Sequence, residues 1–106
     1  MNDKIKKLAA RYAEVLEELE PYGDLDRRLS VADYRQFTSA EVNVRLVASA
    51  LVEGRFPITI NLLTPSGAKP SVLRADDRQQ LEDLYAKTLA HGIQVAEQIK
   101  VQLNRS

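Results

Sequence analysis

The sequence predicts a mainly helical α+β fold: an amphipathic N-terminal helix, a second helix, a two-stranded β-hairpin and a long C-terminal helix packed on it. Apolar residues recur at helical spacing near both ends of the chain, which is typical of amphipathic helices. Two short apolar runs flank Pro65-Ser66-Gly67, and these residue types favour a turn. The 106 residues suffice for one small domain. We expect residues 1–22 to form the N-terminal helix and residues 23–106 a compact helix–hairpin–helix body.

The first helix is expected over residues 3–20, because its apolar side chains form a single stripe. The stripe consists of Ile5, Leu8, Tyr12, Val15, Leu16 and Leu19. Asn2 or Asp3 can cap the start of the helix, and Pro21 ends it. A stripe of this length is too apolar to stay exposed, so it covers the body or binds another chain. We therefore predict partner binding through Ile5, Leu8, Tyr12, Leu16 and Leu19.

The charges of this helix run against its dipole, which favours acidic residues first and basic residues last. The first half carries Lys4, Lys6, Lys7 and Arg11, and the second half carries Glu14, Glu17, Glu18 and Glu20. Two partners would match this order: an antiparallel second copy of the helix, or the C-terminal helix lying parallel to it. A solvated face without any partner is the third interpretation.

The middle of the chain is less certain from sequence. In residues 24–37, Ser30 with Asp33 resembles a capping box that would start a short helix, while a strand near Val31 is the alternative. A second helix is predicted over residues 39–53, with Thr38 and Glu41 at capping-box spacing and Gly54 as the C-terminal cap. Its buried stripe would be Val44, Val47, Ala48 and Leu51. An alternating pattern through the same residues also fits a strand, but the two caps favour the helix.

The hairpin is predicted from alternation. One strand face carries Ile58, Ile60 and Leu62, and the other carries Thr59 and Asn61. Residues 64–69 have turn chemistry, and residues 70–73 form the returning strand. A lone two-stranded hairpin is marginal in water. We therefore expect the second helix and the C-terminal helix to cover the isoleucine face.

The C-terminal helix is expected over residues 75–104. Its apolar stripe contains Leu81, Leu84, Tyr85, Leu89, Ile93, Ala96, Ile99 and Leu103. Gly92 falls inside this stripe although glycine lowers helix stability by about 1 kcal/mol, so we expect another backbone to approach closely there. The acidic residues near the start complement the helix dipole, which we favour over a metal site. They are Asp76, Asp77, Glu82 and Asp83.

Composition argues against several classes of function. The charge is balanced, with 15 basic and 15 acidic residues, so we expect no nucleic-acid or membrane binding. The sequence contains no cysteine, and TPSGAKP lacks the spacing of a phosphate-binding loop. His91 is the only histidine, and its position on the helix predicts a solvent-facing residue and not a general base. We expect no catalytic residue, cofactor or metal, and a cytoplasmic location because neither a signal peptide nor a membrane span is recognisable.

From residue 31 to its end, the chain resembles a known family. It reads SVADYRQFTSAE, VRLVASALVEG, FPITINLLTPSG and LRADDRQQLEDLYAKTLAHGI in order. Over residues 31–106 this order is similar to a domain of unknown function found in phage tail-fibre and tail-assembly proteins. The tryptophan expected in the first hairpin strand is missing, and Arg74 stands where the family often has Thr or Asp. The family implies no catalytic residues.

These observations predict a non-enzymatic structural or assembly protein of a phage or prophage tail. It would act through protein–protein contacts and self-association, as a homo-oligomer made in the host cytoplasm and able to become part of a virion. The alternative is a small phage-encoded inhibitor that sequesters a host or defence factor, since such proteins are also short and free of catalytic motifs. An enzyme is the third and least favoured hypothesis.

Overall fold

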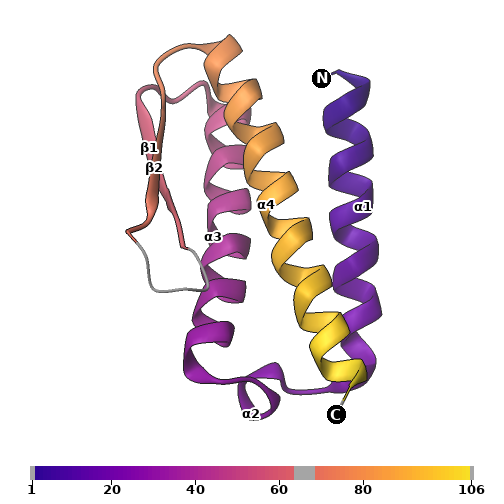
Figure 1. Cartoon of the computed structure of the whole chain (residues 1–106). Coiled ribbons are helices and arrows are strands. Elements are labelled where there is room, and N and C mark those ends of the chain that lie inside the picture. The colour runs from indigo at the N-terminus through magenta and orange to yellow at the C-terminus, as the bar shows by residue number, and fades with distance from the viewer. Residues whose placement is uncertain (1, 64–68, 106) are drawn as a thin grey trace.

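The computed structural model describes residues 2–63 and 69–105 (Figure 1). In chain order the elements are α1 (Asp3–Leu19), the 3-10 helix η1 (Glu20–Tyr22), α2 (Leu25–Arg28), α3 (Val31–Glu53), β1 (Ile58–Leu62), β2 (Ser71–Ala75) and α4 (Arg78–Asn104). This architecture confirms the predicted mainly helical α+β fold with one hairpin and a long C-terminal helix. The predicted turn lies largely at residues 64–68, outside the described residues.

The long helix α4 is the centre of the molecule. α3 and α1 both pack on α4, and the hairpin lies on the side opposite α1 (Figure 1). β1 contacts α3 and β2 contacts α4, so the two helices together cover one face of the sheet, as predicted. Ile60 on that face is 3% exposed, while Thr59 on the other is exposed, which confirms the predicted strand phase. Within the described residues, no helix is both long and apolar enough to cross a membrane.

α3 is longer than predicted. It begins at Val31, because the Ser30 hydroxyl accepts a hydrogen bond from the Asp33 backbone N–H at 3.1 Å. This settles residues 31–37 as helix, and the strand near Val31 is wrong. The predicted cap at Thr38 is also wrong, since its hydroxyl donates to the Arg35 carbonyl oxygen within the helix at 3.2 Å. Gly54 ends α3 in the left-handed conformation at φ 66°, as expected for a glycine cap.

α4 is shorter than predicted. It begins at Arg78 and not at residue 75, because β2 continues through Ala75, which is opposite Ile58 in the sheet. The small Ala75 side chain is fully buried there, so this residue belongs to the paired strand and not to the helix. Asp77 then caps α4, with its carboxylate accepting from the Gln80 N–H at 2.8 Å. Asp76 and Asp77 therefore precede the helix and do not lie in its first turn.

Candidate protein-binding surface beside the hairpin

Two buried side-chain amides of α3 attach the hairpin. Asn43, 7% exposed, donates from Nδ2 to the Asn61 carbonyl oxygen at 2.8 Å. Gln36, 8% exposed, donates from Nε2 to the Leu63 carbonyl oxygen at 3.3 Å. Buried amides need such partners, because a lost bond leaves a desolvated polar group. Both bonds end on main-chain atoms at one edge of β1, so α3 covers that edge.

These bonds also establish which way the backbone groups of the sheet point. The strands are antiparallel, with Ile60 opposite Leu73 and Asn61 opposite Val72. In an antiparallel pair, the N–H and C=O of one residue point to the same side, and the side alternates along the strand. The Asn61 carbonyl points to α3 and away from β2, so the bonds between the strands belong to Ile58, Ile60 and Leu62. On β2, the N–H and C=O of Val72 and Arg74 must therefore point to the outer edge.

The outer edge of β2 is open. Among residues 2–63 and 69–105, none forms a hydrogen bond with the outward backbone groups of Val72 or Arg74. Val72 is also 64% exposed, which is a large exposure for a valine. Such an edge is a template for another strand unless a protein covers it. The two edges of this hairpin therefore differ: β1 is covered by α3, and β2 is available.

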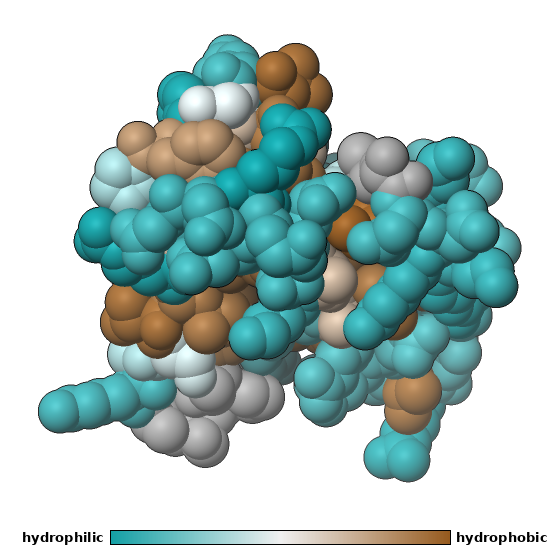
Figure 2. Space-filling view, turned by 90° about the horizontal axis from the view of Figure 1, so that it is seen from above, coloured by the Kyte–Doolittle hydropathy of each residue, from teal (hydrophilic) through white to brown (hydrophobic). Residues whose placement is uncertain are grey.

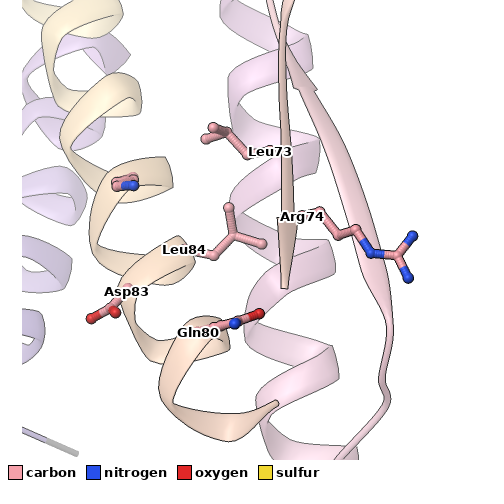
Figure 3. A pocket seen from close by; sticks show the side chains of 6 residues that line it. Leu73, Arg74, Gln80, Asp83 and Leu84 are labelled. Carbon is pink, nitrogen blue, oxygen red and sulfur yellow. The ribbon is translucent and has the colours of Figure 1, made fainter. Parts of the chain in front are cut away.

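A groove of about 150 Å³ runs between β2 and α4, directly beside this edge (Figure 3). Its lining residues are Leu73, Arg74, Gln80, Asp83, Leu84 and Lys87. Leu73 and Leu84 provide apolar surface. The Arg74 guanidinium points away from the groove, as Figure 3 shows. It pairs with Asp76 at 2.8 Å. Gln80 accepts from the Asp76 N–H at 2.8 Å, which holds the junction between β2 and α4.

The apolar stripe of α1, predicted to bind a partner, packs on the body of the same chain. Ile5, Tyr12 and Leu19 are buried. Leu8 and Leu16 are partly buried against the same core. The structure therefore gives these five residues an intramolecular role, and their role toward another chain stays a prediction.

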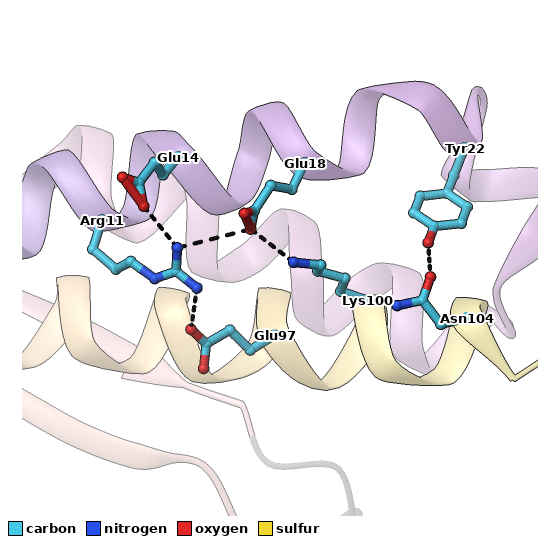
Figure 4. A network of polar contacts seen from close by, with 7 residues as sticks. All are labelled: Arg11, Glu14, Glu18, Tyr22, Glu97, Lys100 and Asn104. Carbon is cyan, nitrogen blue, oxygen red and sulfur yellow. Dashed lines mark hydrogen bonds and ion pairs between the residues drawn. The ribbon is translucent and has the colours of Figure 1, made fainter.

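α1 runs parallel to α4, which is one of the two arrangements that its charge order predicted. Arg11 contacts Glu97 at 2.9 Å and Glu18 contacts Lys100 at 3.0 Å, in the same order along both helices (Figure 4). Further on, the Tyr22 hydroxyl is hydrogen-bonded to Asn104. The hydrogen bond with Lys100 lowers the pKa of Glu18. The hydrogen bonds with Glu14 and then Glu97 raise the pKa of Arg11.

A second and wider groove lies between the start of α1 and α4, with a volume of about 330 Å³. It is lined by Lys4, Leu8, Asp83, Ala86, Lys87 and Ala90. Figure 2, viewed from this end, shows hydrophobic side chains in the hollow between a part of the surface with mixed hydropathy and a mainly hydrophilic part. Asp83 and Lys87 line both grooves, so they form the ridge of α4 that separates them.

Gly92 lies where α1 crosses α4 closely, but the neighbour is a side chain and not the expected backbone. A Cβ at Gly92 would lie 2.9 Å from Cε1 of the Tyr12 ring. Burial raises the pKa of Tyr12 to about 12, and the charge of Glu41 adds to the increase. The Tyr12 hydroxyl is buried, and no described residue forms a hydrogen bond with it. The ring therefore occupies space that glycine leaves, at the cost of an unpaired hydroxyl.

His91 is not solvent-facing, so this prediction is wrong. Its Nε2 lies 3.2 Å from the Leu63 carbonyl oxygen, and the ring is half-buried. Because a carbonyl only accepts, Nε2 carries the proton, and the buried Nδ1 has no partner among the described residues. Helical projection failed because α4 is covered on two sides, by the other helices and by the hairpin. The contact that partly buries His91 is with Leu63, just after β1, which a helical projection of α4 alone cannot show.

Three of the four acidic residues near the start of α4 have separate structural contacts. Asp76 pairs with Arg74 and Asp77 caps the helix. Asp83 accepts from Gln79 at 3.4 Å. Over residues 2–63 and 69–105, no group of three or more His, Cys, Asp or Glu side chains is arranged to hold a metal ion.

Comparison with protein-family models, with curated proteins and with solved structures finds no match to this chain. The resemblance to the phage tail domain therefore stays a prediction from sequence. Sequence reasoning missed the open edge of β2, because that edge is defined by where the Asn61 carbonyl points. Val72 was the available signal, since it is a β-branched residue on the face opposite Leu73.

Proposed function

We propose that the protein is a non-enzymatic structural or assembly protein that acts through protein–protein contacts and self-association. The observation that supports this proposal is the open edge of β2, which carries the exposed Val72 on one face and borders a groove lined by Leu73 and Leu84 on the other. An exposed sheet edge of this kind accepts an extended segment through main-chain hydrogen bonds. The resemblance of residues 31–106 suggests the setting, which would be the tail of a phage or prophage.

Sedimentation of the purified chain over a wide range of concentration tests self-association. We expect the mass to rise with concentration above that of the 11.9 kDa monomer. The proposed location in a phage tail has a separate test, in which tails are purified from a producing host and probed with an antibody against this chain. A chain that stays monomeric at every concentration and is absent from purified tails would contradict the proposed function.

A further inference from the structure

We infer that two copies of the chain join along β2 into one four-stranded antiparallel sheet, with Val72 of each copy opposite Arg74 of the other. This inference rests on the proposed self-association and adds its surface, symmetry and register. It starts from the difference between the two sheet edges. α3 covers β1 through Asn43 and Gln36, while the outward backbone groups of β2 have no partner among the described residues.

The register follows from the groups that β2 offers. With Val72 opposite Arg74 of the second copy, each of these residues exchanges an N–H and a C=O, which gives four hydrogen bonds around a twofold axis. A register with Arg74 opposite itself would place two guanidinium groups side by side, which is unfavourable. A register with Val72 opposite itself would pair Arg74 with Pro70, which has no N–H to donate. The first register avoids both defects.

The side chains of β2 also fit this pairing. Leu73 would lie opposite Leu73 of the second copy, on the face that already contacts Leu84 in the groove. Its apolar surface would then be shared by both copies. On the other face, Val72 would lie beside the Arg74 stem of the second copy. Because Asp76 already balances the Arg74 charge at 2.8 Å, bringing two Arg74 residues into one sheet adds little repulsion.

The charges of α4 support a second copy as the occupant. The proposed twofold axis passes beside Leu73, and the groove places residues 80–87 of α4 next to Leu73. Because α4 packs against β2, α4 of the second copy would pack against its own β2 strand and run antiparallel to the first α4. Asp83 and Lys87 are exposed and lie one helical turn apart on the ridge, so two antiparallel ridges would present opposite charges to each other. Lys87 forms no ion pair with any described residue of its own chain. A self-complementary surface of this kind is what a twofold dimer requires.

Single cysteines test the register directly, because the sequence contains none. Residues opposite each other in an antiparallel sheet have Cα atoms about 4.5–5.5 Å apart, within the range of a disulfide. Leu73→Cys is expected to form a covalent dimer under mild oxidation. Val72→Cys and Arg74→Cys are expected to crosslink when mixed. Each alone is expected not to, because two residues along a strand add about 6.8 Å to the separation. Thr59→Cys is the matched control, on an exposed position of β1.

The outcomes separate this inference from the proposed function. Rapid crosslinking of Leu73→Cys and of the mixed pair, with none for Thr59→Cys, supports the inferred register. If wild-type protein sediments as a dimer but Leu73→Cys crosslinks no faster than Thr59→Cys, the inference is overturned while self-association stands. If Val72→Cys alone crosslinks faster than the mixed pair, β2 pairs in another register, and the inference is again wrong. A monomer at every concentration overturns both self-association and the inference.

Discussion

The hairpin and α1 both pack on the body formed by α3 and α4, but they are attached by different interactions. The hairpin places Ile60 in the core, and two buried amides of α3 donate to its main-chain oxygens. α1 contributes an apolar stripe, and its polar contacts with α4 are ion pairs between partly exposed side chains.

The difference shows which contacts determine position. A buried amide that is bonded to a carbonyl accepts only one register, because any shift leaves the amide and the carbonyl unpaired. Exposed ion pairs tolerate rearrangement and contribute little. We therefore expect the position of the hairpin to depend on its buried hydrogen bonds. The position of α1 should depend on how its apolar side chains fit against α4, above all where Tyr12 packs on Gly92.

The largest expected effect is on the hairpin. Ile60→Ala should lower the free energy of unfolding by about 2–4 kcal/mol, because it empties a buried position. Thr59→Ala is the matched control on the exposed face and should cost well under about 1 kcal/mol. Urea denaturation measures both. Equal losses at the two positions would contradict the observed strand phase.

The next effect concerns the crossing of α1 and α4. Gly92→Ala should destabilise the fold by about 1–3 kcal/mol, because its Cβ would lie 2.9 Å from the Tyr12 ring. This loss would exceed the gain of about 1 kcal/mol from replacing a glycine within a helix. Thermal unfolding of the variant in the Tyr12→Leu background provides the control, since a smaller loss is expected there. A variant more stable than wild type would show that the crossing is not tight.

Tyr12 itself gives a pH-dependent prediction. Because its folded pKa is raised to about 12 from 10.0, the folded state keeps the proton that the unfolded state loses above pH 10.0. Stability should therefore fall as the pH rises between these values. Tyr12→Phe should remove this loss and raise stability near neutral pH by about 1 kcal/mol, since the buried hydroxyl has no partner among the described residues. Chemical denaturation at neutral and alkaline pH measures both effects. A destabilised phenylalanine variant would indicate a hydrogen bond that this account lacks.

The smallest effect is expected at the ion pairs. Glu18→Lys should weaken the attachment of α1 slightly, because it places two ammonium groups together at Lys100. Because the pKa of Glu18 is lowered in the folded state, its contribution to stability is present at pH values above the ordinary pKa of a carboxyl group. That contribution is lost as the pH falls through the folded-state pKa. Adding Lys100→Glu to Glu18→Lys should recover the lost stability, because the pair again has opposite charges. Unfolding at low salt detects this best, and an identical loss in the single and double variants would argue against a direct pair.

The sequence predicted the parts of the fold that follow from periodicity. The stripes of α1 and α4, the strand phase at Ile60 and the glycine cap at Gly54 all depend on neighbours within a few residues. The parallel arrangement of α1 and α4 was one of two alternatives. The order of charges along α1 indicates what charges its neighbouring helix should carry, but not whether that helix belongs to the same chain or to a second copy.

The remaining features depend on contacts far apart in the sequence. Strand pairing with Ile58 extends β2 to Ala75, and Ser30 starts α3 earlier than the spacing of Thr38 and Glu41 suggested. The partial burial of His91 and the open edge of β2 both follow from how the hairpin sits on the helices. No local pattern encodes that arrangement, so the candidate surface could not be found before the fold was known.

Amide hydrogen exchange along β2, measured at several protein concentrations, tests most directly whether the open edge joins two copies. In the monomer, the Val72 and Arg74 amides point to solvent, while the Leu73 amide is bonded to β1. We predict that Val72 and Arg74 exchange quickly in dilute solution and become protected as concentration rises, with Leu73 protected throughout. If Val72 and Arg74 stay unprotected in a solution whose mass shows a dimer, the copies associate elsewhere and the central claim is wrong.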